Sequence, residues 1–243
     1  MTVCWFATFR CPTAPQSDIS DNELAWLKRC VASTPRLRQG LIFTASSTRD
    51  PYLDDGPPPQ LVLQLYFDDI AELEAATARD GHLRAVATSG ALPSLDDAEI
   101  TQQAMLVRRF PVPDPVFRTP PGERPCTYLV AYEGDAEDLH AWHTHYIAEH
   151  LPIMARFPGI RQIEVYTCID WCCGLPWQRV AYMQRNKVVF DSQAALTAAL
   201  NSPVRHEMRA AFAGFPPFTG PITHFPMATL TVVPTLEQLD PWP

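Results

Sequence analysis

The chain lacks the features that would direct it into or across a membrane. No apolar run approaches the ~20 residues needed to span a bilayer, and the N-terminus MTVCWFATFRCP has neither the basic segment nor the long apolar stretch of a signal peptide. The seven cysteines are an odd number without a CxxC pair, which favours free thiols over a disulfide framework. We therefore expect a soluble, cytoplasmic protein.

Basic residues and the common catalytic motifs are also scarce. The chain has 19 Lys and Arg against 27 Asp and Glu, a net charge of −8, and no basic cluster that could neutralise a row of phosphates. Nucleic acid and anionic membranes are therefore not expected as partners. The absence of GxGxxG, P-loop, HExxH and GxSxG motifs excludes the common nucleotide-binding, zinc-protease and hydrolase classes.

A repeat with a period of 123 residues is the most informative feature that is present. PRLRQGLIFT at 35–44 corresponds to PGIRQIEVYT at 158–167, and FDDIAELEAA at 67–76 corresponds to FDSQAALTAA at 190–199. Solenoid repeats run at roughly 20–50 residues, so this spacing indicates two copies of a whole small domain. The predicted divisions are a degenerate first repeat at 1–112, a proline-rich linker at 113–125, a second repeat at 126–234 and a tail at 235–243.

Each copy has the pattern of a βαββαβ unit. In the second copy we predict strands at 126–132, 160–167, 178–190 and 228–234, with helices at 139–157 and from Asp191 or Ser192 to Phe212. Pro152 should interrupt the first of these helices beside His150, because proline has no N–H to donate. The first copy repeats the order and includes a helix at 70–87. This order is the ferredoxin-like pattern.

A four-stranded sheet with both helices on one face leaves its other face bare. Two such sheets in one chain can bury those faces against each other. The expected fold class is therefore α+β, with two tandem ferredoxin-like repeats packed sheet to sheet. We expect a monomer, because the duplicated unit supplies the partner that a single unit would need.

The run HYIAEHLPIMARFPGI at 145–160, followed by VVFDSQAALTAAL at 188–200, resembles the EthD-like branch of the dimeric α+β barrel superfamily. The first copy departs from this signature, with Glu23 and Leu27 at the positions of Tyr146 and His150. The resemblance implies that one chain fuses both halves of a barrel that relatives build from two chains. It also implies kinship with cofactor-free isomerases, polyketide cyclases and monooxygenases, and with haem-handling proteins.

Tyr146 and His150 are the predicted catalytic residues. They stand four apart on a helix, so their side chains share one face and the phenol can orient or polarise the imidazole. A histidine with a pKa near 6.5 is suited to proton transfer as general base or acid. The resemblance to the EthD-like proteins implies a functional role for the same two residues. The alternative is a structural His150 that bonds a carbonyl freed by the Pro152 kink.

The histidines before this pair raise the question of a metal. His140, His143, His145 and Glu149 offer imidazole and carboxylate ligands, but at 100° per residue they point to different sides of a helix. We predict no metal site. His143 is expected at the edge of the pocket.

An aromatic set on the second copy predicts an apolar pocket for a ring-bearing molecule. Trp171 and Trp177 lie in a loop and should either cover a cavity mouth or meet the other half. The larger cavity should be bounded by Tyr146, His150 and Tyr166, with its first-copy counterpart filled or open. The predicted substrate-binding residues are Trp142, His143, Phe157, Tyr166, Trp171, Trp177, Phe215, Phe218 and His224.

The function we predict is that of a cofactor-independent enzyme acting on a small hydrophobic metabolite by proton transfer from or to His150. Isomerase, cyclase and lyase reactions of a catabolic kind fit this chemistry. Alternatives are a cofactor-free monooxygenase, a haem protein with His150 as axial ligand, and a non-catalytic binder of hydrophobic molecules.

Overall fold

The computed structural model describes residues 1–14 and 18–235, which form two halves with the same order of elements. The first half contains β1 (Val3–Arg10), α1 (Asp21–Ala32), β2 (Gln39–Ala45), β3 (Leu61–Phe67), α2 (Ile70–Thr77) and β4 (Glu99–Phe110). The second contains β5 (Cys126–Tyr132), α3 (Leu139–His145), the π-helical turn η3 (Tyr146–His150), α4 (Leu151–Met154), β7 (Ile160–Cys168), β9 (Gln184–Phe190), α5 (Gln193–Leu200), α6 (Pro203–Phe212) and β11 (Ile222–Val232). Short elements complete the chain: η1 (His82–Ala85), η2 (Pro93–Leu95), β6 (Asp135–Ala136), β8 (Gln178–Arg179) and β10 (Phe218–Thr219).

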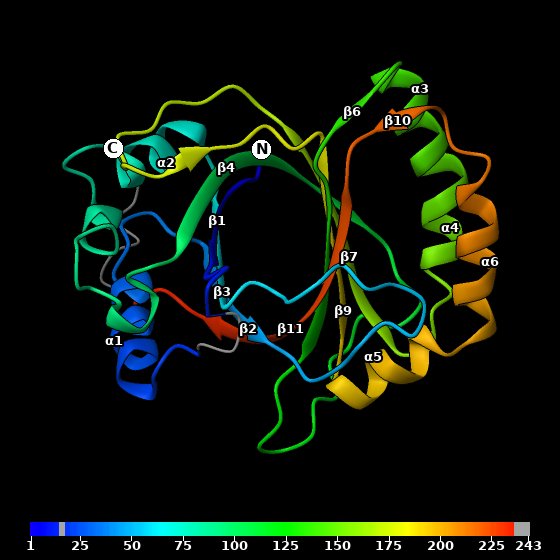
Figure 1. The fold of residues 1–243 in the computed structure, drawn as a ribbon, viewed down its shortest axis with the longest axis horizontal. Coiled ribbons are helices and arrows are strands. Elements are labelled where there is room, and N and C mark those ends of the chain that lie inside the picture. The colour runs from blue at the N-terminus through cyan, green and yellow to red at the C-terminus, as the bar shows by residue number, and fades with distance from the viewer. Residues whose placement is uncertain (15–17, 236–243) are drawn as a thin grey trace.

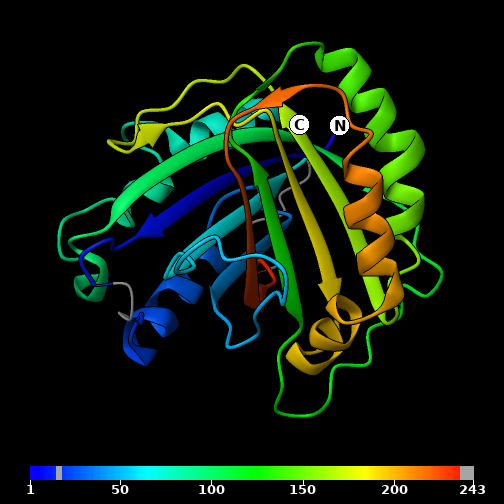
Figure 2. The same cartoon turned by 45° about the vertical axis from the view of Figure 1, so that its right-hand side comes forward.

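Eight strands close into an antiparallel barrel. Their order is β1-β3-β2-β11-β5-β9-β7-β4, and β4 pairs back with β1. The halves are hydrogen-bonded to each other along both edges, through β2 with β11 and β4 with β7. Figures 1 and 2 show the strands wrapping round a common axis, with α1 and α2 outside one half and α3 to α6 outside the other. The predicted α+β class is confirmed. We expected the two sheets to meet through their faces, and the structure shows in addition that they are hydrogen-bonded along both edges, which closes the barrel.

Strand alternation divides the core into three parts. Side chains on the outer face of each half pack against that half's helices, and inward side chains from both halves meet inside the barrel. On β9, for example, Val188 and Phe190 pack on the helices. The cluster inside the barrel includes Phe6 and Phe43 from the first half and Tyr166 from the second. The two halves therefore share the cluster inside the barrel.

A buried polar network joins the halves inside the barrel. The Glu164 carboxylate accepts hydrogen bonds from the hydroxyls of Tyr66 and Tyr166, both at 2.6 Å, and lies 3.1 Å from Lys187 Nζ. Burial alone would raise the pKa of Glu164, but Lys187 and the two hydroxyls lower it to about 2. Because Tyr66 comes from the first half, the network helps to fix how the two sheets meet.

Several predicted elements have different limits in the structure. The strand expected at 228–234 runs from Ile222 to Val232, and the helix expected at 139–157 ends at Met154. The helix expected at 70–87 ends at Thr77, where the backbone N–H of Gly174 donates to the Thr77 carbonyl at 2.9 Å, and only a 3₁₀ turn follows. The strand expected at 178–190 is divided into β8 and β9. The predicted interruption beside His150 is present as the π-helical turn η3, with Pro152 in the first turn of α4.

The two halves exchange loops. The segment between β2 and β3, residues 46–60, which we call the roof loop, lies over the second half: Ser47 Oγ donates to Gln193 Oε1 at 2.7 Å. The segment at 169–177, which we call the plug loop, enters the first half, where Trp177 stacks on Trp5 at 5.9 Å between ring centroids. Figure 1 shows the roof loop crossing toward α5.

The 123-residue correspondence is also visible in backbone geometry. Arg36, at φ 61°, and Gly159, at φ 75°, both occupy the left-handed region, and they stand one repeat period apart. Residues 113–125 contain neither helix nor strand and are mostly exposed. No helix within residues 1–14 and 18–235 is long and apolar enough to cross a membrane.

Candidate active site

A cavity of about 520 Å³ lies between the sheet and the helices of the second half. The strands supply its floor through Tyr128, Val130 and Val188, and α5 and α6 supply much of its wall. Leu53 and Asp55 of the roof loop also line it, so both halves contribute to the site. Apolar side chains make up most of the rest of the lining: Met154, Phe157, Phe190, Leu196, Leu200, Met208, Phe212 and Ile222.

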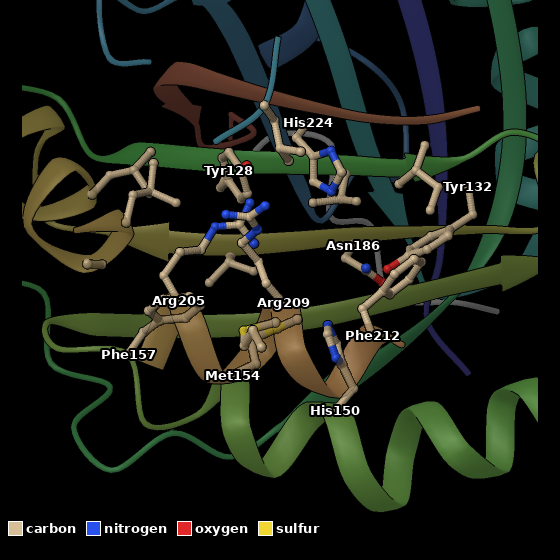
Figure 3. A pocket seen from close by; sticks show the side chains of 18 of the residues that line it. Tyr128, Tyr132, His150, Met154, Phe157, Asn186, Arg205, Arg209, Phe212 and His224 are labelled. Atoms are coloured by element: carbon tan, nitrogen blue, oxygen red, sulfur yellow. The ribbon is translucent and has the colours of Figure 1, made fainter. Parts of the chain in front are cut away.

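His150 lines this cavity from the end of the π-helical turn. Its side chain is 5% exposed and packs between the rings of Tyr146 and Phe215, at centroid distances of 4.9 and 5.0 Å. The Nδ1 atom is buried and has no hydrogen-bond partner among the residues that the structure describes. Figure 3 shows the imidazole reaching from its helix toward the sheet. A π-helical turn is often found at functional sites, where it re-aims side chains.

The environment of His150 keeps its imidazole neutral. Burial lowers its pKa to about 4, and the nearby charges of Arg205, His145 and His224 act in the same direction. At neutral pH the ring is therefore an unprotonated base in a site that resists a net positive charge. A substrate that becomes anionic beside it would relieve this resistance, because opposite charges favour the imidazolium.

Tyr146 makes contact with His150 through its ring and not through its hydroxyl. The hydroxyl accepts a hydrogen bond from Asn186 Nδ2 at 2.6 Å. Burial raises the pKa of Tyr146 well above its usual value, so the phenol stays protonated. The expected orienting hydrogen bond to the imidazole is absent among the described residues. The pair still stacks as the four-residue spacing predicts.

A second polar group lies at the roof-loop side of the cavity. Asp50 binds Arg205 through an ion pair of 2.6 Å and accepts a hydrogen bond from the Tyr128 hydroxyl. His224 Nδ1 lies 2.9 Å from Asp55 Oδ2, and this contact lowers the pKa of the Asp55 carboxyl against the effect of burial. The Nε atom of Arg205 is buried without a hydrogen-bond partner within the described part of the chain. Figure 3 shows Arg205 and Arg209 entering the cavity from α6.

Several predicted substrate-binding residues lie at or beside the cavity. Phe157 and His224 line it. Trp142, Phe215 and Phe218 form an aromatic cluster next to it, in which Trp142 contacts the two phenylalanines at 4.9 and 5.2 Å between ring centroids. Through Phe215, this cluster packs against the rings of Tyr146 and His150.

His143 lies on α3, close in sequence to His140 and His145. Burial lowers the pKa of His143, with the charges of Arg108 and His140 adding to the effect. His143 is half-buried on α3 and is not part of the cavity wall. Among the described residues, no group of three or more His, Cys, Asp or Glu side chains could hold a metal ion.

Three predicted residues lie elsewhere. Tyr166 points into the barrel, where its hydroxyl binds Glu164, so the expectation that it bounds the cavity is wrong. Trp171 and Trp177 are packed in the core of the first half, which is the second of the two places expected for them. Strand parity accounts for Tyr166, because inward and outward residues alternate along β7.

The plug loop explains why the halves differ. Leu27, one period before His150, is fully buried in the first half's core together with Trp171 and Leu175 of that loop. The roof loop is held at the surface of the second half by polar contacts and leaves the 520 Å³ cavity beneath it. The plug loop therefore fills the space beneath the helices of the first half, and the roof loop covers the cavity of the second half.

The sequence gives little sign of the other polar residues in the site. Asn186 and Tyr128 lie on predicted strands, and the alternation around Tyr128 could have placed it toward the helices. Asp50 and Asp55 come from a loop of the first half, and Arg205 from α6, so no local pattern brings them together. Only the closed fold does so.

No family model matches the chain, and no curated protein matches it. Solved structures do. An anthrone oxidase-like protein aligns with 13% identity and a TM-score of 0.62, covering 98% of this chain and 95% of its own. A candidate monooxygenase from Fusobacterium nucleatum aligns with 7% identity and a TM-score of 0.58, covering 96% and 94%. Another from Lactobacillus acidophilus aligns with 11% identity and a TM-score of 0.52, covering 96% and 97%. These similarities show that the chain has the fold of the dimeric α+β barrel proteins.

Proposed function

We propose that this protein is an enzyme that transfers a proton on a small apolar, ring-bearing molecule, with His150 as the general base. The observation that carries the proposal is a neutral imidazole that lines a 520 Å³ cavity and makes no hydrogen bond with the described residues. A base with this position is worth about 10²–10⁴-fold in rate. The cavity's aromatic and aliphatic walls suit a ring system.

The environment of His150 favours one kind of proton transfer. A cationic imidazolium is disfavoured there by burial and by Arg205, unless an anion forms next to it. Removal of a proton activated by a carbonyl creates such an anion, an enolate. The guanidinium of Arg205 lines the same cavity and can stabilise the enolate oxygen. Isomerisation, cyclisation and lyase cleavage all begin with this step.

A cofactor-free monooxygenase is the second candidate. The names of the anthrone oxidase-like and monooxygenase neighbours favour it. Here the same base would form the carbanion, which would then react with molecular oxygen at carbon. The two candidates share His150 and differ in whether oxygen is consumed.

In this proposal the site works without a bound cofactor. The alternative is haem with His150 as its axial ligand. A Soret band on haem titration that is lost in His150→Ala would favour haem.

We also propose that the second half derives from an EthD-like unit that was duplicated within one chain. The protein acts as a monomer, because the barrel already closes between its two halves.

Deuterium exchange tests the proposed proton transfer without knowledge of the natural substrate. Anthrone, whose methylene protons are activated by its ring carbonyl, and 1-indanone are incubated with the protein in D₂O under nitrogen, and exchange is followed by proton NMR. We expect catalysed exchange, and in air we expect oxygen uptake only if the monooxygenase candidate is right. Binding of these ketones without any exchange would identify a non-catalytic binder instead.

The pH dependence follows from the lowered pKa of His150. The rate of the free enzyme should be constant from about pH 5.5 to 8 and should fall below this range with an inflection near the pKa of about 4. The unfolded chain binds the proton at a pKa near 6.5, so the free energy of unfolding should decrease as the pH falls from about 6.5 toward 4. A kcat/KM profile with its inflection at pH 6.5 would contradict the assigned environment.

A further inference from the structure

A buried arginine that makes no ion pair with the described residues lies inside the barrel, on the face of β9 opposite the candidate active site. The guanidinium of Arg185 lies over two rings, with its central carbon 4.9 Å from the Phe6 centroid and 4.7 Å from the Tyr182 centroid. Its N–H groups, which lie in the guanidinium plane, are left to bind something at the edge.

Among the described residues no carboxylate lies within ion-pair distance of Arg185, although the charge of Glu133 acts on it from farther away. Arg185 Nε is buried without a hydrogen-bond partner, and Arg185 takes part in none of the ion pairs found among residues 1–14 and 18–235. The side chain is 8% exposed, and burial lowers its pKa. A buried charge with neither ion pair nor hydrogen bonds is strongly disfavoured, so such groups are normally paired.

A small void lies beside this guanidinium at the mouth of the barrel. Its volume is about 30 Å³, and its lining includes Thr8, Arg10, Glu133 and Arg185. Thr8 Oγ1 is also buried without a partner in the described structure. Glu133 accepts a hydrogen bond from Thr223 Oγ1 at 3.0 Å. With both arginines charged and one carboxylate present, the lining carries one excess positive charge.

We infer that this void binds a small monovalent anion, held by the terminal N–H groups of the Arg185 guanidinium. A planar oxyanion of the size of nitrate or formate fits best, because its oxygens match the paired N–H groups of arginine. The void is too small for the ring-bearing molecule of the proposed function. The inference therefore does not depend on that function.

Thermal unfolding in matched salts tests the anion site. At constant ionic strength, sodium nitrate or formate replaces sodium gluconate, whose anion is too large for the void. We expect the wild-type Tm to rise saturably by about 3 °C. Arg185→Met should have a higher Tm than the wild type in gluconate, because it removes an unpaired buried charge, and should show no rise with nitrate.

Arg108→Gln is the matched control. Arg108 also lies over an aromatic ring, that of Phe110 at 6.0 Å, but it does not line the void, so this variant should respond to nitrate as the wild type does. An equal rise in Arg185→Met would overturn the inference. If Arg185→Met does not fold, crystals of the wild type are grown in bromide, which gives an anomalous signal. A bromide peak at hydrogen-bond distance from Arg185 would support the site. Water alone at that position would refute it.

Discussion

Replacing His150 by alanine is expected to lower kcat/KM by about 10²–10⁴-fold and to change the free energy of unfolding by less than about 1 kcal/mol. The loss of rate follows because no other side chain that lines the cavity combines a neutral imidazole with an unpartnered nitrogen among the described residues. The stability change is small because two effects offset each other. The variant loses ring contacts with Tyr146 and Phe215 but also removes a buried polar atom without a partner.

Two further variants separate a catalytic role from a structural one. His143→Ala removes a half-buried imidazole from α3 outside the cavity wall and should keep the wild-type rate. Tyr146→Phe loses the single hydrogen bond from Asn186, about 0.5–1.5 kcal/mol, and should lower the rate much less than His150→Ala. The readouts are deuterium exchange on anthrone and urea unfolding. Wild-type exchange in His150→Ala would rule out the assignment, and a large loss of stability there would favour a structural role.

The fold was predictable because the same pattern of strands and helices occurs twice in the sequence, so each copy supports the assignment of the other. The 123-residue period and the strand alternation describe each βαββαβ half, and Ser192 does precede α5 as expected. Closure of the barrel was not predictable in the same way. It depends on pairing between β2 and β11 and between β4 and β7, segments far apart in sequence whose edges carry no distinctive residues.

The candidate site was predictable where it follows a single helix. The spacing of Tyr146 and His150, with the helix break at Pro152, places both on the cavity wall. The error concerns Tyr166, which strand parity turns to the barrel interior. Trp171 and Trp177 meet the other half, which is one of the two places expected for them, but local pattern could not decide between those places. Loop exchange between halves cannot be inferred from local pattern.

Because the roof loop crosses from the first half to the second, the ion pair between Asp50 and Arg205 becomes important for the stability of the second half. Asp50 of the roof loop and Arg205 of α6 are 3% and 9% exposed, and the Tyr128 hydroxyl also depends on Asp50 as its acceptor. Asp50→Ala would leave a buried cation and a buried hydroxyl without their partner. Such a loss usually costs about 3–5 kcal/mol, because the remaining charge stays desolvated.

We therefore expect Asp50→Ala to lower the free energy of unfolding by about 3–5 kcal/mol in urea titrations, and to weaken binding of ring ketones in the cavity that the roof loop covers. Glu207→Ala is the control: it breaks an ion pair with Arg156 whose side chains are about half exposed, so a change below about 1 kcal/mol is expected. The double variant Asp50→Ala/Arg205→Met should be more stable than Asp50→Ala alone, because an apolar side chain replaces the unpaired charge. Equal stability of Asp50→Ala and Glu207→Ala would show that the roof loop is not held by this pair. In that case the contacts of Ser47 and Thr48 with Gln193, together with that of Asp55 with His224, would hold the loop over the second half.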